Sequence, residues 1–555
     1  MPGYYDLGTH TRSISTQSEE AQRWFDRGLI WCYGYNHEES VRCFQKAAEL
    51  DPGCAMAYWG IAYASGCNYN KAWGAFREDE LELAFPAIDA AIHKAVALSK
   101  TASPVERALI EALTHRYPAN RDDPYAFSAW NDAYAAAMRK VYGLFPNDLD
   151  VSTLFAEALI NRTPWQLWNL KNGQPAVGAD TLEAVDVLET ALQQVEKDGL
   201  EPHPGLLHMY IHTMEMSPYP ERALPASDAL RDLVPEAGHL RHMPSHIDVL
   251  CGRYREAVIA NSKAIEADTK YLQREGPLNF YTLYRCHDYH FKLYAAMFLG
   301  QSQAALEAAS QMVATIPEEL LRVELPPMAD WLEGFISMRL HVYIRFGMWE
   351  EILAEPLPQD SDLYCVTTAM LHYARGIALA VKGQIEAAEA EQLKFAQAVS
   401  KIPETRYVFN NKCTDILAVA AQMLEGEIEY RKGNFEQAFA HLHRSVELDD
   451  NLPYDEPWGW MQPARHALGA LLLEQGRVAE AEQIYRDDLG LNTTLSRASQ
   501  HPENVWSLQG YVECLHKLHK HHEAMQMEKR LEQAKAWADV PIQASCFCRL
   551  EVSQS

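Results

Sequence analysis

Residues 24–52 read WFDRGLIWCYGYNHEESVRCFQKAAELDP, and this stretch decides the fold. Large and small residues recur along it in a fixed order, namely Trp24, Gly28, Phe44 and Ala47. Small residues let two helices of a hairpin approach closely, and the aromatic side chains fill the space beside them. Pro52 ends the second helix, because proline cannot continue the helical hydrogen bonding. The stretch therefore predicts a helical hairpin.

Similar spacings return further along the chain, so the hairpin is predicted to be a repeat. The copies lie at 251–268, 293–317, 424–450, 464–489 and 503–515. With Ser40 in place of the usual alanine, the pattern resembles tetratricopeptide repeats, most specifically over 24–64 and 415–515. The resemblance implies an all-α fold, a solenoid or superhelix of stacked helical hairpins.

The segments between these repeats also indicate helices, because their apolar residues recur with a helical period and no strand-like alternation is present. The proline, glycine and aspartate content predicts loops at 172–180, 357–364 and 449–460. We expect one continuous solenoid-like body in six segments. They are N-terminal hairpins (1–80), helical repeats (81–200), histidine-rich hairpins (201–300), helical repeats (301–410), C-terminal repeats (411–540) and a tail (541–555).

Composition narrows the possible partners. The chain has 555 residues and a net charge of −27, so a nucleic-acid backbone or an anionic membrane surface would be repelled, whereas a small neutral or cationic molecule would not. No secretory signal and no apolar stretch of membrane-spanning length is evident. The odd number of cysteines, 11, favours reduced thiols and a cytoplasmic location.

Histidines cluster where the repeat pattern is weakest. Eight of the 22 histidines lie within residues 203–290. If 205–217 is helical, His208, His212 and Glu215 share one face. Two further pairs follow, at His242 and His246 and at His287 and His290, and imidazoles one turn apart can bind one metal ion. The alternative is that each histidine caps a helix or bonds a loop carbonyl.

The sequence of residues 203–247 also resembles a segment found in a group of large microbial tetratricopeptide-repeat proteins. It reads HPGLLHMYIHTMEMSPYPERALPASDALRDLVPEAGHLRHMPSHI. These proteins share a histidine-bearing stretch of this form and an N-terminal FNH-like motif, which here is YNHEES. The resemblance implies no particular reaction. The matched positions are His37, His208, His212, Glu215, His242, His246 and His290.

Pro244 complicates the middle pair, because proline is tolerated in the first turn of a helix but not inside it. His242 and His246 are therefore expected to straddle a loop and a first turn. We predict them as better ligands than His239, which we interpret as structural.

An imidazole-rich site favours copper, iron or zinc over magnesium or calcium. Two histidines with one carboxylate suit a mononuclear iron or zinc centre, whereas five or six imidazoles suit copper or a two-metal centre. The sequence thus predicts a metalloenzyme acting on a small organic molecule, by oxidation rather than hydrolysis. The predicted ligands are His208, His212, His242, His246 and His290, and Glu215 is a ligand or a general base.

Three alternatives stay open: a tetratricopeptide interaction scaffold that binds a protein partner, a metal-dependent hydrolase or lyase, and a binding protein with a structural zinc. A pocket is also possible in which Trp458 and Trp460 form walls and Arg465 binds an anion. The other interpretation is that the tryptophans pack the loop and Arg465 pairs with Asp455. His37 and His287 complete the candidate pocket residues.

Overall fold

The computed structural model describes residues 3–117 and 126–549, and the chain divides into two compact units. The first unit comprises Met1–Ile247 and Lys263–Glu275. The second comprises Asp248–Ser262 and Gly276–Ser555. The division falls within two helices, α12 (Pro244–Leu250) and α13 (Tyr254–Glu275).

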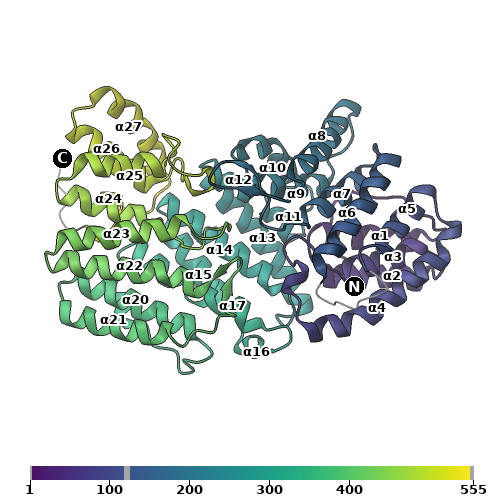
Figure 1. The fold of residues 1–555 in the computed structure, drawn as a ribbon, viewed down its shortest axis with the longest axis horizontal. Helices are drawn as coiled ribbons and strands as arrows, with labels where there is room; N and C mark the ends of the chain where they lie inside the picture. Colours follow the sequence, from purple (N-terminus) through teal and green to yellow (C-terminus); the bar gives the residue numbers. More distant parts are fainter. Residues whose placement is uncertain (1–2, 118–125, 550–555) are drawn as a thin grey trace. The chain divides into compact units, whose positions relative to one another are not determined.

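The first unit consists of helices packed mostly against their neighbours in the chain (Figure 1). Its longer helices are α1 (Glu19–Tyr33), α2 (His37–Leu50), α3 (Ala55–Ala64), α4 (Glu78–Leu98), α5 (Pro104–Thr114), α6 (Phe127–Leu144), α7 (Leu149–Ile160), α8 (Thr181–Asp198) and α9 (Pro204–Glu215). Its shorter elements are η1 (Trp73–Ala75), η2 (Ser99–Thr101), β1 (Trp168–Asn169), β2 (Gln174–Pro175), η3 (Pro220–Ala223), α10 (Leu224–Leu230) and α11 (Gly238–His242).

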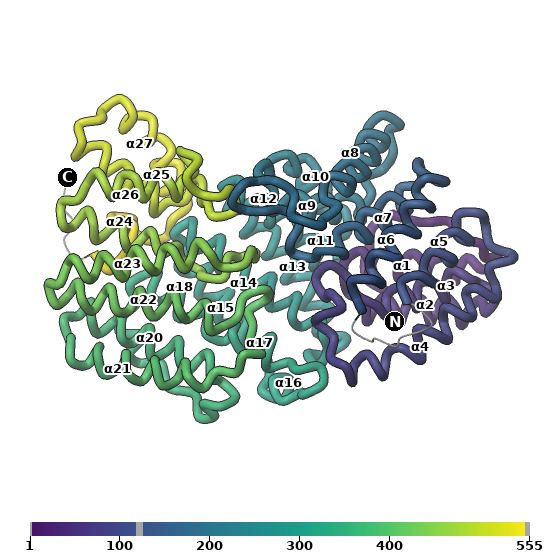
Figure 2. The backbone as a smooth tube through the Cα atoms, viewed as in Figure 1, coloured from purple at the N-terminus to yellow at the C-terminus, as the bar shows by residue number. Residues whose placement is uncertain are grey.

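The second unit continues the pattern with successive antiparallel hairpins, which the backbone trace in Figure 2 follows from α20 to α27. Its first elements are α14 (Thr282–Leu299), α15 (Ser302–Ala314), α16 (Glu318–Leu321), α17 (Met328–Ile336), α18 (Met338–Arg345), α19 (Trp349–Ala354), α20 (Cys365–Val381) and α21 (Ile385–Val399). The remainder are β3 (Tyr407–Val408), β4 (Asn411–Lys412), α22 (Cys413–Arg431), α23 (Phe435–Asp450), α24 (Ala464–Glu474), α25 (Val478–Asp488), η4 (Arg497–Ser499), α26 (Val505–Lys517) and α27 (His521–Lys535).

In each unit, one set of three successive helices packs with an aromatic ring between two glycines. A Cβ atom added to Gly28 or Gly60 would lie 2.7 or 2.5 Å from the Phe44 ring, so α1 and α3 both approach α2 at a glycine. Tyr485 of α25 lies in the same way between Gly469 of α24 and Gly510 of α26. This packing confirms the predicted all-α fold of stacked helical hairpins within each unit.

Two local features were not evident from the sequence. Ser40, which replaces the usual small apolar residue, donates a hydrogen bond of 2.7 Å from its hydroxyl to the Gly28 carbonyl, which satisfies its buried polar group. Contrary to the expectation of no strands, two antiparallel pairs are present, β1 with β2 and β3 with β4. Each strand has only two residues, too few to show an alternating pattern.

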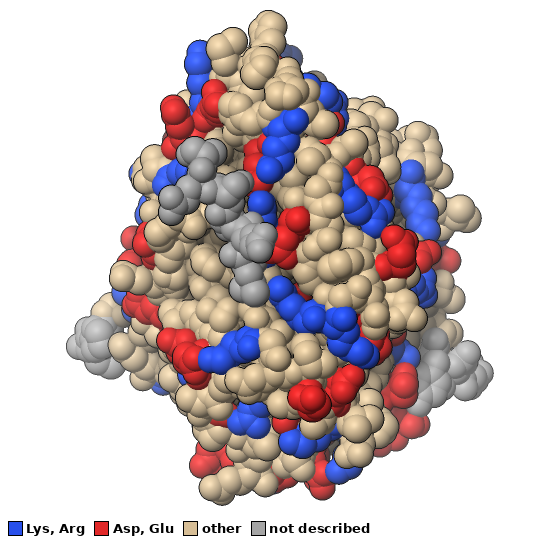
Figure 3. Space-filling view, turned by 90° about the vertical axis from the view of Figure 1, so that its left-hand side faces the viewer, with Lys and Arg blue, Asp and Glu red and all other residues tan. Residues whose placement is uncertain are grey.

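Charges of both signs are intermingled over the face shown in Figure 3, where acidic and basic side chains lie side by side. Many charged side chains of the second unit form ion pairs with residues nearby in the chain, such as Arg444 with Glu447 and Arg477 with Glu480. Among the described residues, no helix combines the length and the apolar character needed to cross a bilayer.

Candidate metal centre

Helix α9 carries three of the predicted site residues. It begins at Pro204, where proline is tolerated because the first turn needs no donor, and the His203 side chain caps it by accepting from the Leu206 N–H at 3.2 Å. Every residue of α9 is buried. His208, His212 and Glu215 therefore face the interior of the first unit with no access to bulk water, as the helical spacing predicts.

His208, His212 and His239 form the first metal-capable group. One ligand atom from each of the three side chains lies within 4.8 Å of the other two. All three residues are buried, with at most 1% of their surface exposed. Metal–imidazole bonds are about 2.0–2.1 Å long, so small adjustments of the side chains would bring three such atoms onto one ion.

The protonation of two of these rings is set by their neighbours. His208 Nδ1 lies 2.6 Å from the Tyr33 carbonyl oxygen, and His212 Nδ1 lies 3.0 Å from Glu215 Oε1. The Tyr33 carbonyl oxygen can only accept, so His208 Nδ1 carries the proton. An ionised Glu215 likewise accepts from His212 Nδ1, and each Nε2 then keeps its lone pair. Both Nε2 atoms are buried and have no hydrogen-bond partner among the described residues. Imidazoles that bind metals are oriented in this way, by a carbonyl or carboxylate behind the ring.

Burial also keeps both imidazoles neutral. It lowers the pKa of His212 to about 3. Burial, reinforced by the neighbouring His212, lowers the pKa of His208 well below its ordinary value. A metal ion binds only the neutral imidazole, so no proton has to be displaced from either Nε2 near neutral pH.

Glu215 links the first group to a second pair of histidines. Its Oε2 accepts from His246 Nδ1 at 2.7 Å, while its Oε1 accepts from His212 Nδ1 at 3.0 Å. Burial raises the pKa of this carboxyl. By distance, Glu215 could itself hold an ion with His212 and His246. In the observed arrangement, however, both of its oxygens orient imidazoles.

His242 and His246 contact each other across the break that Pro244 introduces. His242 ends α11, and His246 lies in the first turn of α12. Their Nε2 atoms are 2.7 Å apart, a hydrogen-bond distance. Two imidazoles on one tetrahedral ion would have their nitrogens about 3.4 Å apart. The proton of His246 is on Nδ1, facing Glu215, so His242 donates from Nε2.

Aromatic side chains enclose the first group. The Tyr35 ring lies 4.7 Å from His208 and 5.5 Å from His239, between centroids. Tyr69 lies 4.9 Å and Trp165 5.8 Å from His212. Tyr35 and Trp165 both adopt left-handed backbone, with φ of 56° and 59°. Such backbone is costly for a bulky residue and is concentrated at functional sites.

The remaining predicted residues are His37, His287 and His290. His37 lies beside Tyr35, at 6.3 Å between centroids, and its Nε2 is 3.4 Å from the Asn68 amide nitrogen. Burial and then the charge of Arg116 lower the pKa of His37 to about 3. His287 and His290 belong to α14 of the second unit, where both rings contact Phe409.

The predicted loop pocket is occupied by its own side chains. The Trp458 indole N–H donates to Asp449 Oδ1 at 3.0 Å, and Trp460 packs on His341 at 4.9 Å between centroids. Arg465 forms a bidentate salt bridge with Asp450. The sequence interpretation named Asp455 as that partner and was wrong. Asp455 instead accepts hydrogen bonds from Asn410 and Asn411.

The sequence reasoning missed a further group, formed by His10, Asp150 and His203 beside a hollow of about 530 Å³. Its members come from distant parts of the chain, so no spacing could reveal it. His203 Nδ1 accepts from a backbone N–H, so its proton is on Nε2, which donates to Asp150 at 3.1 Å. His203 therefore lacks the outward lone pair that His208 and His212 have. Burial opposes ionisation of Asp150, but His203, His10 and Arg12 hold its pKa well below the ordinary value.

No family model and no curated protein matches the chain. Among solved structures it is similar to yeast Tom70, at 12% identity over 94% of this chain and 90% of that one, with a TM-score of 0.28. It is also similar to the APC/C hetero-tetramer Cut9–Hcn1, at 13% identity over 89% of this chain and 76% of that one, with a TM-score of 0.30. A third similar structure is an IFIT1 mutant with m7Gppp-AAAA, at 11% identity over 86% of this chain and 90% of that one, with a TM-score of 0.33. Such low TM-scores support no inference about function.

Proposed function

We propose that the first unit holds a transition-metal ion through His208, His212 and His239, and that this ion is the reaction centre for a small organic molecule. The observation that carries the proposal is the pair of buried Nε2 atoms without hydrogen-bond partners among the described residues, on rings whose Nδ1 protons are already bonded. Leaving such polar atoms buried and unpaired is costly unless a ligand satisfies them.

An all-imidazole donor set suits copper, zinc or iron. When bound, the ion would supply an open coordination position for O₂, water or a substrate atom. The residues of this chain position the ligands and shield the site. The Tyr33 carbonyl and Glu215 orient the imidazoles, and the enclosing aromatic side chains exclude water. We favour an oxidative reaction, because imidazole-rich sites favour redox-active metals.

Metal content and geometry test the proposal. Purified protein, loaded with Cu²⁺, Zn²⁺ or Fe²⁺ and freed of excess ion, is expected to retain about one equivalent of one metal, as seen by elemental analysis. X-ray absorption is expected to show nitrogen ligands at about 2.0–2.1 Å and no sulfur. Retention below about a tenth of an equivalent of all three metals would overturn the proposal.

Glu215 offers a second test, because it distinguishes a ligand from a residue that orients ligands. Glu215→Gln keeps the size of the side chain but replaces one accepting oxygen with a donor. If Glu215 orients His212, metal affinity is expected to fall about 10- to 100-fold while the nitrogen ligand number stays the same. Competition with a chelator measures the affinity and X-ray absorption the ligand number. Loss of an oxygen ligand would instead make Glu215 a ligand.

The repeat fold itself favours the second candidate, a protein-interaction scaffold. In the second unit, a hollow of about 750 Å³ lies beside residues 355–364 and is lined by Arg339, Glu355 and Leu340. Its mixed apolar and charged walls suit an extended peptide. A stoichiometric partner captured by the wild type and by His208→Ala alike, but not by Arg339→Glu, would support the scaffold and leave the metal without a role in binding.

A further inference from the structure

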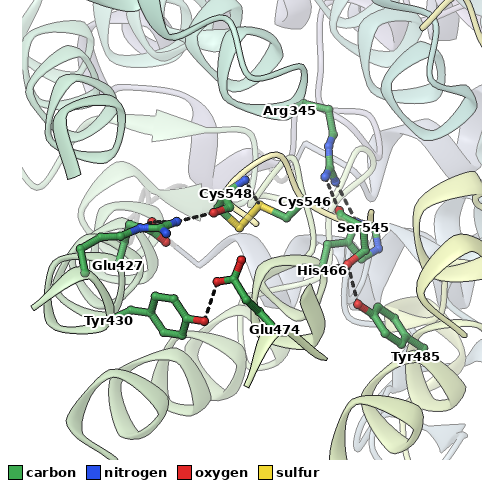
Figure 4. The surroundings of a disulfide bond; sticks show 10 residues. Arg345, Glu427, Tyr430, His466, Glu474, Tyr485, Ser545, Cys546 and Cys548 are labelled. Carbon is green, nitrogen blue, oxygen red and sulfur yellow. Dashed lines mark hydrogen bonds and ion pairs between the residues drawn. A yellow bond between two sulfur atoms is a disulfide. The ribbon is translucent and has the colours of Figure 1, made fainter. Parts of the chain in front are cut away.

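The C-terminal segment is docked onto the second unit by Ser545 (Figure 4). The Ser545 hydroxyl donates to the His466 carbonyl at 2.8 Å and lies 2.6 Å from the Tyr485 hydroxyl. The Arg345 guanidinium donates to the Ser545 carbonyl. Three helices, α18, α24 and α25, therefore hold this one residue in place.

Further anchors lie just beyond it. Arg431 of α22 donates to the Cys548 carbonyl. Arg549 forms a two-pronged ion pair with Glu513 of α26, at 2.7 and 2.9 Å. The segment is thus fixed on both sides of the Cys546–Cys548 disulfide by contacts that do not involve sulfur.

This disulfide contributes little as a structural crosslink. It joins residues only two apart, and a crosslink that closes so short a loop removes little entropy from the unfolded chain. The other nine cysteines are thiols, and eight of them are buried. In compartments that keep thiols reduced, a disulfide is usually transient and serves catalysis or redox sensing rather than stability.

The two sulfurs have different surroundings, as expected of an exchange pair. Cys546 is half-buried and therefore reachable, whereas only 3% of Cys548 is exposed. The Cys548 backbone N–H donates to Cys546 Sγ at 3.2 Å. That donor stabilises a thiolate on Cys546, and the guanidinium group of Arg345, bonded to the same segment, adds positive charge.

We infer that Cys546 and Cys548 form a thiol–disulfide exchange site for dithiol reductants. A reductant thiolate attacks Cys546 Sγ, the S–S bond breaks, and Cys548 leaves as a thiolate that takes up a proton. The second thiol of the reductant then attacks the mixed disulfide and releases Cys546. The reductant is oxidised to its disulfide, and the protein gains two electrons and two protons.

Serine variants of the full chain test the assignment with 5,5′-dithiobis(2-nitrobenzoate) as the probe. In the reduced wild type, Cys546 is expected to react first and Cys548 to displace the adduct, which restores the disulfide. Cys548→Ser is expected to retain a stable adduct on Cys546. Cys546→Ser is expected to react at least about tenfold more slowly, because Cys548 is buried. Mass spectrometry of the peptide containing residues 546–548 separates this pair from the other cysteines.

Two results would overturn the inference: stable adducts forming equally fast on both variants, or both thiols alkylating fully in air-oxidised wild type. Both variants are expected to melt within about 2 °C of the wild type. Should a variant misfold, the wild type alone decides. As the ratio of reduced to oxidised dithiothreitol is raised, the fraction of wild-type protein that carries the disulfide is expected to fall from more than about nine-tenths to less than about a tenth. A pair that stays in one state throughout is not an exchange site.

Discussion

Replacing both His208 and His212 with alanine is expected to abolish metal binding by the first unit. The two rings supply the buried Nε2 atoms that have no hydrogen-bond partner among the described residues, so the double variant leaves His239 alone in that group. Loss of an outer-sphere partner alone costs metal sites about 10- to 100-fold in affinity, so removal of two ligands is expected to cost well over 100-fold. Equilibrium dialysis against a chelator buffer measures the change.

Thermal unfolding gives an independent readout of the same loss. An ion at about 1,000 times its Kd stabilises the folded wild type by about 4 kcal/mol, because it binds the folded state only. The double variant is expected to melt at the same temperature with and without metal. His372→Ala is the matched control, since it removes another buried imidazole, bonded to Glu391 at 2.7 Å, in the second unit. If this control loses the metal as completely as the double variant, His208 and His212 are not the ligands.

Much of the fold could be predicted because its determinants are local. The spacing between Gly28 and Phe44 reports a close helix approach within one hairpin, and the structure shows that approach directly. Helical periodicity also placed His208, His212 and Glu215 on one face of α9. Such features need only the geometry of a single helix or hairpin.

The rest of the candidate site depends on contacts that no local pattern encodes. The Tyr33 carbonyl that orients His208 lies 175 residues earlier in the chain. The sequence favoured His242 over His239 as a ligand. In the structure Pro244 divides the segment into two short helices. As a result, His242 bonds to His246, and His239 lies with the α9 histidines. The role of Tyr35 beside the histidines could not be predicted from the sequence either, because its left-handed backbone is a property of the folded chain.

Acid is expected to destabilise the second unit through its buried histidines. Burial lowers the pKa of His341 to about 3. Burial likewise lowers the pKa of His466 to about 4, although Asp488 opposes this shift. In the unfolded chain both titrate near 6.5. Below that pH the unfolded state binds protons that the folded state cannot, so stability is complete above about pH 6.5 and falls continuously toward pH 3–4.

The expected loss is large enough to measure. Between pH 7 and pH 5 each of these histidines is expected to remove about 2 kcal/mol from the free energy of unfolding, against a total of about 5–15 kcal/mol for a domain. Urea unfolding at each pH measures it. His341→Gln, which cannot titrate, is expected to lose about 2 kcal/mol less than the wild type over this range. His522→Gln, at an exposed position, is the control. Parallel curves for His341→Gln and the wild type would show that His341 does not drive the acid sensitivity.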